Sequence, residues 1–149
     1  RAELKLKELR SKKAPSIKEA ANLFSTIVYQ NIRQHSPILA VTHFLLAGYD
    51  YTGFSLYDVN PDGHLNQVGT FSATGSGMIQ CHPILDSEYK ENLTLQEGIK
   101  LALKCINAAM KRDPATGAGI DVYIITKDNI KHELEQGIKQ EFVNKERGK

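Results

Sequence analysis

The order of helix and strand patterns along this 149-residue chain predicts an α+β fold. Helical patterns precede a run of strand patterns, two more helices follow, and a pair of strands comes last. Such segregation predicts antiparallel sheet with helices covering its faces. No repeat or linker interrupts the pattern, and the length suits one domain, so residues 1–149 are expected to form a single domain.

The clearest helix start is a capping box, in which Ser16 is the cap and Glu19 stands three residues later. Pro37 predicts that this helix ends at 35–36, because proline disfavours helical geometry in the residue before it. Residues 1–10 also predict a helix, but no cap and no initiator methionine precede it. The chain is therefore expected to begin partway through a longer protein. The apolar face of the second helix comprises Ile17, Ala20, Ala21, Phe24, Ile27 and Val28.

The strand patterns begin with residues 38–49, which are apolar almost throughout and predict a central strand buried on both faces. His43 within this run is expected to be a core histidine with its hydrogen bonds satisfied. Alternation over residues 54–59 predicts a second strand. The turn 61–63, with proline and glycine, predicts an antiparallel third strand that ends near Gly69.

A glycine-rich corner, Gly75-Ser76-Gly77, connects these strands to an apolar segment that begins at Met78. Two glycines around one hydroxyl let the backbone turn tightly and bring its N–H groups toward a ligand. The dinucleotide fingerprint fails because Gln80 stands where its third glycine belongs, and Thr74 breaks the nucleophile-elbow pattern. From these residues alone, a purely structural corner is the more frequent explanation.

Two helices are predicted after this corner. Residues 78–89 keep helical spacing, and Pro83 either kinks this helix or marks its true start. Thr94 and Glu97 form a second capping box, and the helix that follows stops at Asp113 before a proline. The face of this helix expected to be buried comprises Leu95, Ile99, Ala102, Leu103, Ile106, Ala109 and Met110.

The last elements are a strand at 121–126, a turn at 127–129 and a short returning strand at 130–132. Residues 133–149 are charged. They predict either a solvated helix or partial disorder.

Composition narrows the range of functions. The formal net charge of +2 gives no reason to expect a nucleic-acid partner, and no apolar run approaches the length of a membrane span. No signal peptide is evident. Cys81 and Cys105 lack C-x-x-C spacing, so we expect reduced core thiols in a cytosolic protein and no metal site. No cofactor motif is present.

Two loops carry the candidate polar groups: the corner with Ser76, and residues 113–117 at the end of the last predicted helix. Asp113 faces the negative pole of that helix, which is unfavourable without a donor or cation nearby. It is either an ordinary turn aspartate before proline or a carboxylate that orients a hydroxyl and a cation. No Ser/His/Asp triad can be recognised in the sequence, because none of the five histidines has a carboxylate at a suggestive spacing along the chain.

With these two loops, the chain resembles the β-type subunits of the proteasome core particle, in the N-terminal-nucleophile hydrolase superfamily. Glycine-serine-glycine and arginine-aspartate-x-x-hydroxyl-glycine occur together, and their separation along the chain also matches the family. The stretches that carry the resemblance are Arg1–Leu4, Ser16–Tyr29, Leu46–Asp50, Thr74–Gly77, Leu95–Asp113, Gly119–Val122 and Ile125–Lys127.

The resemblance implies a four-layer αββα sandwich, incomplete at its N-terminus, and threonine-type endopeptidase activity. The family's nucleophile is an N-terminal threonine whose α-amino group is the base, assisted by an aspartate and a lysine on early strands. Those groups lie in roughly the first third of the family's length and have no counterparts here, so this stretch alone is expected to be inactive. By resemblance, Ser76 supplies a supporting hydroxyl and Asp113 orients it. Thr116 replaces the usual serine, and Gly77 lies near the substrate oxyanion.

The implied partners are other β-type subunits in a seven-membered ring, α-type rings stacked on it, and unfolded polypeptide substrates. The core degrades these without ATP. The implied location is cytoplasmic, and also nuclear in a eukaryote; neither nucleic acid nor membrane is expected. The alternative is a non-catalytic β subunit that serves ring assembly, which Met78 and Pro83 favour because catalytic members often carry small residues in that segment. A free-standing α+β binding domain is a third hypothesis.

Overall fold

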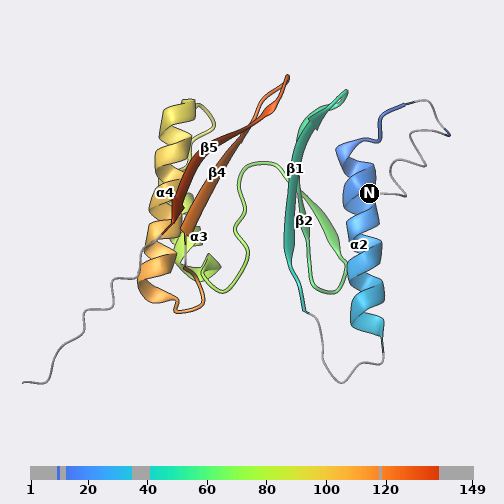
Figure 1. Ribbon diagram of the computed structural model, residues 1–149, viewed down its shortest axis with the longest axis horizontal. Helices are drawn as coiled ribbons and strands as arrows, with labels where there is room; N and C mark the ends of the chain where they lie inside the picture. Colours follow the sequence, from blue (N-terminus) through green and yellow to red (C-terminus); the bar gives the residue numbers. More distant parts are fainter. Residues whose placement is uncertain (1–9, 11–12, 35–40, 118, 138–149) are drawn as a thin grey trace, which may run out of the picture.

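The computed structural model describes residue 10 and residues 13–34, 41–117 and 119–137. It confirms the α+β prediction: antiparallel strands are combined with helices, and strands pair in the order β1-β2-β3 and β4-β5 (Figure 1). The described elements, in chain order, are α2 (Ile17–Arg33), β1 (Phe44–Asp50), β2 (Gly53–Val59), β3 (Leu65–Val68), α3 (Met78–Glu88), α4 (Leu95–Arg112), β4 (Gly119–Ile125) and β5 (Ile130–Gly137).

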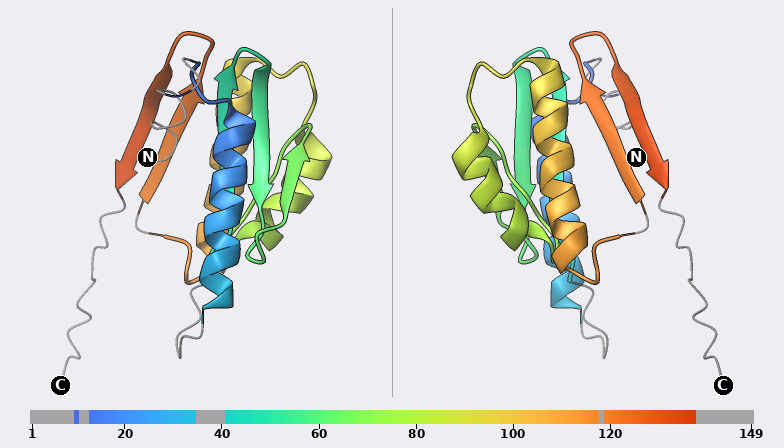
Figure 2. Two further views of the ribbon diagram at one scale, coloured as in Figure 1. Left: turned by 90° about the vertical axis from the view of Figure 1, so that its right-hand side faces the viewer. Right: turned by 90° about the vertical axis from the view of Figure 1, so that its left-hand side faces the viewer.

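The described elements form two units joined by the irregular segment 69–77. The N-terminal unit consists of α2 and the β1–β3 sheet, and the C-terminal unit consists of α3, α4 and the β4–β5 pair. Figure 1 shows the two sheets side by side, with α2 outside one and α3 and α4 outside the other. In the two views turned by 90°, α2 lies in front of the β1–β3 sheet from one side and α4 lies in front from the other (Figure 2). The connecting segment therefore crosses from one unit to the other, and it carries the glycine corner.

The start of α2 confirms the predicted capping box. Ser16 Oγ accepts a hydrogen bond from the Glu19 N–H at 3.2 Å, and the Glu19 carboxylate accepts one from the Ser16 N–H at 3.0 Å. A third residue adds to this cap: Asp50, at the end of β1, accepts from the Ile17 N–H at 2.6 Å. The Thr52 hydroxyl and then the Ile17 N–H lower the pKa of Asp50. This carboxylate thus ties the helix start to the β1–β2 hairpin.

Close packing of α2 on the β1–β3 sheet depends on a glycine. A Cβ at Gly48 would stand 2.3 Å from Cδ1 of Ile17, so the helix start lies directly on the β1 backbone. The buried apolar side chains on this contact are Ala21, Val28, Tyr57 and Val59.

The β2–β3 turn follows the prediction made from its proline and glycine. Gly63 adopts a φ of +84°, and the Asn60 N–H donates to the His64 carbonyl at 2.9 Å. The Ser25 hydroxyl donates to the Gly63 carbonyl at 2.5 Å, which fixes the turn against α2. A Cβ at Gly63 would stand 2.7 Å from Cβ of Tyr29, so this contact also excludes a larger residue.

The prediction of a central strand at 38–49 buried on both faces is wrong. The strand begins at Phe44 and lies at the sheet edge, because β1 pairs only with β2 in the described sheet. Its side chains are partly exposed: Leu45 retains 37% and Tyr49 38% of their accessible surface. One face of β1 contacts α2, while the other borders a cavity of about 280 Å³ that Ile125 of β4 also lines. Residues 38–40 lie outside the described residues.

The C-terminal unit has its core between α3 and α4. Both thiols lie there, as predicted: Cys81 Sγ is 3.5 Å from the Cys105 carbonyl, and burial raises the pKa of each thiol. The α3 helix begins at Met78 and continues through Pro83, so this proline does not mark its start. The buried members of this core are Cys81, Leu101, Cys105 and Ala109.

The start of α4 also matches its prediction, but the predicted buried face is right only in part. Thr94 and Glu97 form the second capping box. The stripe in contact with α3 comprises Leu101, Cys105 and Ala109. Only Ala109 among them belongs to the predicted face, and that face leaves Ile106 37% exposed. Part of that predicted face, with Ile99 and Ala102, lines a cavity of about 470 Å³ shared with β4. The wrong assignment arose because two sides of α4 are apolar, and only contact with α3 decides which is buried.

The final strands are longer than predicted. β5 runs from Ile130 to Gly137, so the prediction of a helix or disorder is wrong for residues 133–137. Residues 138–149, which carry the rest of that prediction, and residues 1–9 lie outside the described residues. Among the helices that the structure describes, none combines the length and the apolar character needed to cross a bilayer.

The burial of α4 predicts different effects for two leucines two residues apart. We expect Leu101→Ala to lower the free energy of unfolding by about 2–5 kcal/mol, because it leaves a cavity between α3 and α4. Leu103 is half-buried, so Leu103→Ala should cost less, about 1 kcal/mol. Urea denaturation of both variants provides the measurement. An equal or larger loss for Leu103→Ala would mean that α4 buries a different face.

Candidate active site

The glycine corner brings a hydroxyl to the start of α3. Gly75 adopts a φ of +93°, and its carbonyl accepts a hydrogen bond from the Met78 N–H at 3.1 Å. Gly77 is the N-cap residue, with φ −79° and ψ 0°. The only side chain within this turn is therefore that of Ser76, and it is exposed.

Asp113 stands at the opposite pole of its own helix, as the C-cap of α4. Its backbone is extended, with φ −106° and ψ 112°, as expected before Pro114. Its N–H donates to the Ala109 carbonyl at 2.7 Å, and its carbonyl accepts from the Thr116 N–H at 3.1 Å. The Ala115 N–H also donates to its side-chain Oδ1 at 3.1 Å. Local hydrogen bonds thus fix both the backbone and one carboxylate oxygen.

The second carboxylate oxygen joins the two loops. Asp113 Oδ2 accepts hydrogen bonds from Ser76 Oγ at 2.5 Å and from Thr116 Oγ1 at 2.5 Å. These hydroxyls, in that order, and then the Ala115 N–H lower the pKa of Asp113. The carboxylate is therefore ionised at neutral pH. It has the donors that a negative charge at a helix C-terminus requires.

Gly77 lets the loops approach this closely. A Cβ on this residue would stand 2.7 Å from Cβ of Ala109, 2.7 Å from Oγ1 of Thr116 and 3.5 Å from Oδ2 of Asp113. The first turn of α3 therefore lies against the carboxylate, where the positive end of the helix dipole favours negative charge. All four residues singled out from the sequence, Ser76, Gly77, Asp113 and Thr116, lie together.

The donors and acceptors of this cluster have defined roles. Because Ser76 and Thr116 both donate hydrogen bonds to Asp113, their oxygens keep lone pairs that can accept further hydrogen bonds. A carboxylate that accepts these protons increases the electron density on both oxygens. Such a site accepts hydrogen bonds from an amine or ammonium group. Within the part of the chain that the structure describes, neither hydroxyl has a hydrogen bond to a histidine, so these residues do not form a Ser/His/Asp triad.

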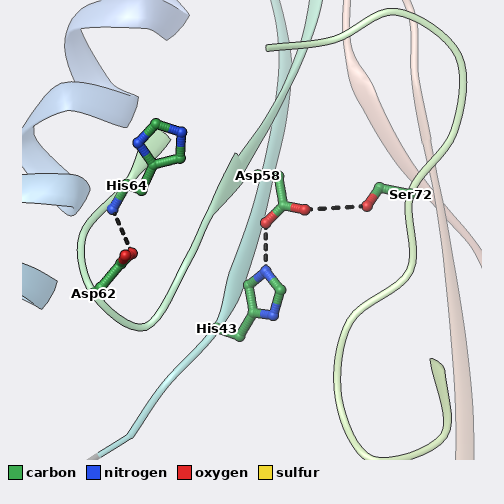
Figure 3. A network of polar contacts seen from close by, with 5 residues as sticks. All are labelled: His43, Asp58, Asp62, His64 and Ser72. Atoms are coloured by element: carbon green, nitrogen blue, oxygen red, sulfur yellow. Dashed lines mark hydrogen bonds and ion pairs between the residues drawn. The ribbon is translucent and has the colours of Figure 1, made fainter. Parts of the chain in front are cut away.

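The sequence analysis missed two histidine–carboxylate pairs. His43 Nε2 contacts Asp58 Oδ1, and His132 Nε2 lies 3.0 Å from Asp121 Oδ1. Both pairs span antiparallel strands or their ends, so their spacing in sequence carried no signal. Asp58 also accepts a hydrogen bond from Ser72 Oγ at 3.3 Å, which creates a network beside the connecting segment (Figure 3).

Two polar atoms in the described residues, Thr74 Oγ1 and Gln80 Oε1, are buried without a hydrogen-bond partner. Within the same residues, no group of three His, Cys, Asp or Glu side chains is placed to hold a metal ion.

Comparison with known proteins identifies the family to which this chain belongs. Residues 1–125 match the family described as "Proteasome subunit", and the chain belongs to this family.

The curated relatives are more specific, because they include archaeal proteins named "Proteasome subunit beta". The chain is 37% identical to "Proteasome subunit beta" of Methanocaldococcus vulcanius and 39% identical to that of Methanocaldococcus fervens. Each comparison covers 131 residues, 87% of this chain and 57% of the relative. It is 34% identical to the Nanoarchaeum equitans subunit of the same name, over 87% of this chain and 65% of the relative. The chain thus spans a little over half the length of the first two relatives.

The lowered pKa of Asp113 predicts a pH dependence of stability. A folded-state pKa below the ordinary value of about 3.9 means that ionised Asp113 stabilises the fold above that pH. This stabilisation is lost as the pH falls through the folded-state pKa. We expect Asp113→Asn to flatten the fall in unfolding free energy below about pH 4. Part of the fall should remain, because Asp50 and Glu97, whose pKa values are also lowered, still contribute to it.

Urea denaturation at a series of pH values from about 2 to 7 measures this effect. Asp128→Asn, in the exposed β4–β5 turn, is the matched control and should keep the wild-type slope. Parallel curves for wild type and Asp113→Asn would contradict the proposed role of the two hydroxyls.

The close contact at Gly77 predicts opposite effects for two Gly→Ala substitutions. Gly77→Ala should destabilise the protein by about 1–3 kcal/mol, because Cβ of Ala109 cannot move away without the helix backbone. Gly98 lies within α4 with nothing within 4 Å of an added Cβ. Gly98→Ala should therefore stabilise the protein, by about 0.5–1 kcal/mol. Thermal unfolding of both variants tests this, and a stabilised Gly77→Ala protein would disprove the contact.

Proposed function

We propose that this chain is part of a β-type subunit of the proteasome core particle, and that the complete subunit is a threonine-type endopeptidase. The observation that carries the proposal is the carboxylate of Asp113, which binds the Ser76 and Thr116 hydroxyls through one oxygen. The similarity of the chain to archaeal proteasome β subunits supports the same function.

In the proposed reaction, the hydroxyl of an N-terminal threonine attacks the carbonyl of the peptide bond. The α-amino group of that threonine takes the proton as general base. The cluster described above suits this amine, because the lone pairs of the Ser76 and Thr116 oxygens can accept hydrogen bonds from its N–H groups. Asp113 fixes the orientation of both hydroxyls and stabilises the amine when it becomes positively charged. Gly77, which adds no side chain beside the carboxylate, is the proposed neighbour of the substrate oxyanion.

The proposal extends to the complete protein and its assembly. We propose a single domain that completes a four-layer αββα sandwich of the N-terminal-nucleophile hydrolase type. Seven-membered rings of β-type subunits stack on rings of α-type subunits and degrade unfolded polypeptides. The proposed location is the cytoplasm, and also the nucleus if the source is eukaryotic. The alternative function is a non-catalytic β subunit that maintains the ring.

Substitution of Asp113 tests the catalytic assignment. We expect Asp113→Asn in the complete, assembled enzyme to lower kcat for peptide hydrolysis by about 10²-fold, because the amine loses its positioned carboxylate. KM should change little, since this carboxylate acts on the amine rather than on bound substrate. Thr116→Ser keeps a hydroxyl at the same place and should retain nearly full activity. Steady-state cleavage of a fluorogenic peptide by isolated rings supplies the measurement.

The control is Asp128→Asn, which removes a carboxylate from the exposed β4–β5 turn and should be silent. Ring assembly is checked separately by size-exclusion chromatography. Full activity of assembled Asp113→Asn rings would refute the site assignment. Inactive wild-type rings that assemble normally would favour the non-catalytic subunit instead.

A further inference from the structure

The connecting segment 69–77 is bound to both units through neighbouring residues. The ring of Phe71 contacts that of Tyr89, the C-cap of α3, with centroids 5.0 Å apart. The next residue, Ser72, donates from Oγ to Asp58 Oδ2 on β2 at 3.3 Å. The segment is thus held to the C-terminal unit by an aromatic contact and to the N-terminal unit by a polar one.

Asp58 occupies an unusual place for a charged residue. Alternation along β2 puts it on the same face as Phe54 and Leu56, opposite the face that contacts α2. Its side chain is only 18% exposed and that of His43 is 23% exposed. A partly buried carboxylate on an apolar face is costly unless its oxygens have partners.

Both oxygens of Asp58 have such partners. Oδ1 contacts His43 Nε2, and Oδ2 accepts the hydrogen bond from Ser72, so the carboxylate lies between the two (Figure 3). The contact with His43 therefore fixes the rotation of the carboxylate and directs Oδ2 toward the connecting segment. The nearby bond from the His64 N–H to Asp62 belongs to the β2–β3 turn and is separate.

Three residues, 73–75, separate Ser72 from Ser76, and Gly75 among them has a positive φ. So short a segment transmits the position of Ser72 to the corner. Ser76 is fixed to the C-terminal unit through Asp113. Ser72 fixes the same segment to the β1–β3 sheet.

We propose that His43, Asp58 and Ser72 form a positioning network for the Ser76 corner, an inference that rests on the proposed function. None of the three touches Ser76, Asp113 or Thr116 in the recorded hydrogen bonds of the described residues, so they act through the segment. The network sets the path of residues 73–75 and hence the direction in which the Ser76 oxygen presents its lone pairs. Small displacements of a catalytic group lower turnover strongly, whereas they leave intact the contacts to parts of the substrate that are distant from the reacting bond.

The test removes the Ser72 hydroxyl and then restores it. We expect Ser72→Ala in the complete, assembled enzyme to lower kcat for a fluorogenic peptide by about five- to tenfold with KM unchanged. Ser72→Thr restores the hydroxyl and should recover most of that loss. Ser87→Ala is the matched control, because Ser87 also donates a side-chain hydrogen bond, to the Ile84 carbonyl at 3.0 Å, at the far end of α3. It should keep wild-type kinetics.

Hydrogen–deuterium exchange gives a second measurement that does not depend on turnover. In Ser72→Ala, the backbone amides of residues 73–77 should exchange faster, while those of β2 and α4 keep their protection. Ser72→Thr should restore slow exchange.

The outcomes separate this inference from the proposed function. Active wild-type rings with unchanged kcat in Ser72→Ala would overturn the network and leave the proposed function intact. A loss confined to KM would also overturn it, since that result indicates a substrate contact. If wild-type rings are inert, the proposed function fails, and hydrogen–deuterium exchange then tests the network alone. Unchanged exchange at residues 73–77 in Ser72→Ala refutes the network. Faster exchange there, reversed in Ser72→Thr, supports it.

Discussion

The described structure depends most on the contact between Ser76 and Asp113, which are 37 residues apart in sequence. It joins the start of α3 to the end of α4 and requires the two helices to lie close together. Small side chains make this possible, because Gly77 and Ala109 meet at the helix ends. Farther along, each cysteine sulphur contacts the backbone of the opposite helix. The candidate site is therefore a direct consequence of how α3 packs on α4.

Local features could be predicted from the sequence, because short-range chemistry determines them. Both capping boxes, at Ser16 and Thr94, and the turn with Gly63 were confirmed, since each depends on residues within a few positions. Burial could not be predicted in the same way. The edge position of β1 and the buried stripe of α4 depend on which element lies opposite, and periodicity cannot identify that element. The extension of β5 through its charged residues likewise depends on pairing with β4.

The candidate site shows the same limit. From the residues alone, a purely structural corner was the more frequent explanation, and only the family resemblance joined Ser76 to Asp113 and Thr116. The structure brings them together without testing their roles. The pair of His43 and Asp58 was missed because its spacing follows from the β1–β2 register. One sequence signal did exist: Asp58 interrupts the apolar face that Phe54 and Leu56 begin.

Three aspartates share one role, since each uses its two carboxylate oxygens to join different elements. Asp50 joins the β1–β2 hairpin to the first turn of α2, Asp58 joins the N-terminal unit to the connecting segment, and Asp113 joins that segment to the end of α4. Asp50 and Asp113 lie at the ends of β1 and α4, and Asp58 lies on the face of β2 opposite α2. Charge-assisted hydrogen bonds suit such places, since they depend on direction and so fix orientation as well as proximity. The path from α2 to the site is thus determined by a succession of carboxylates, and the hydrophobic core of each unit only brings them within reach.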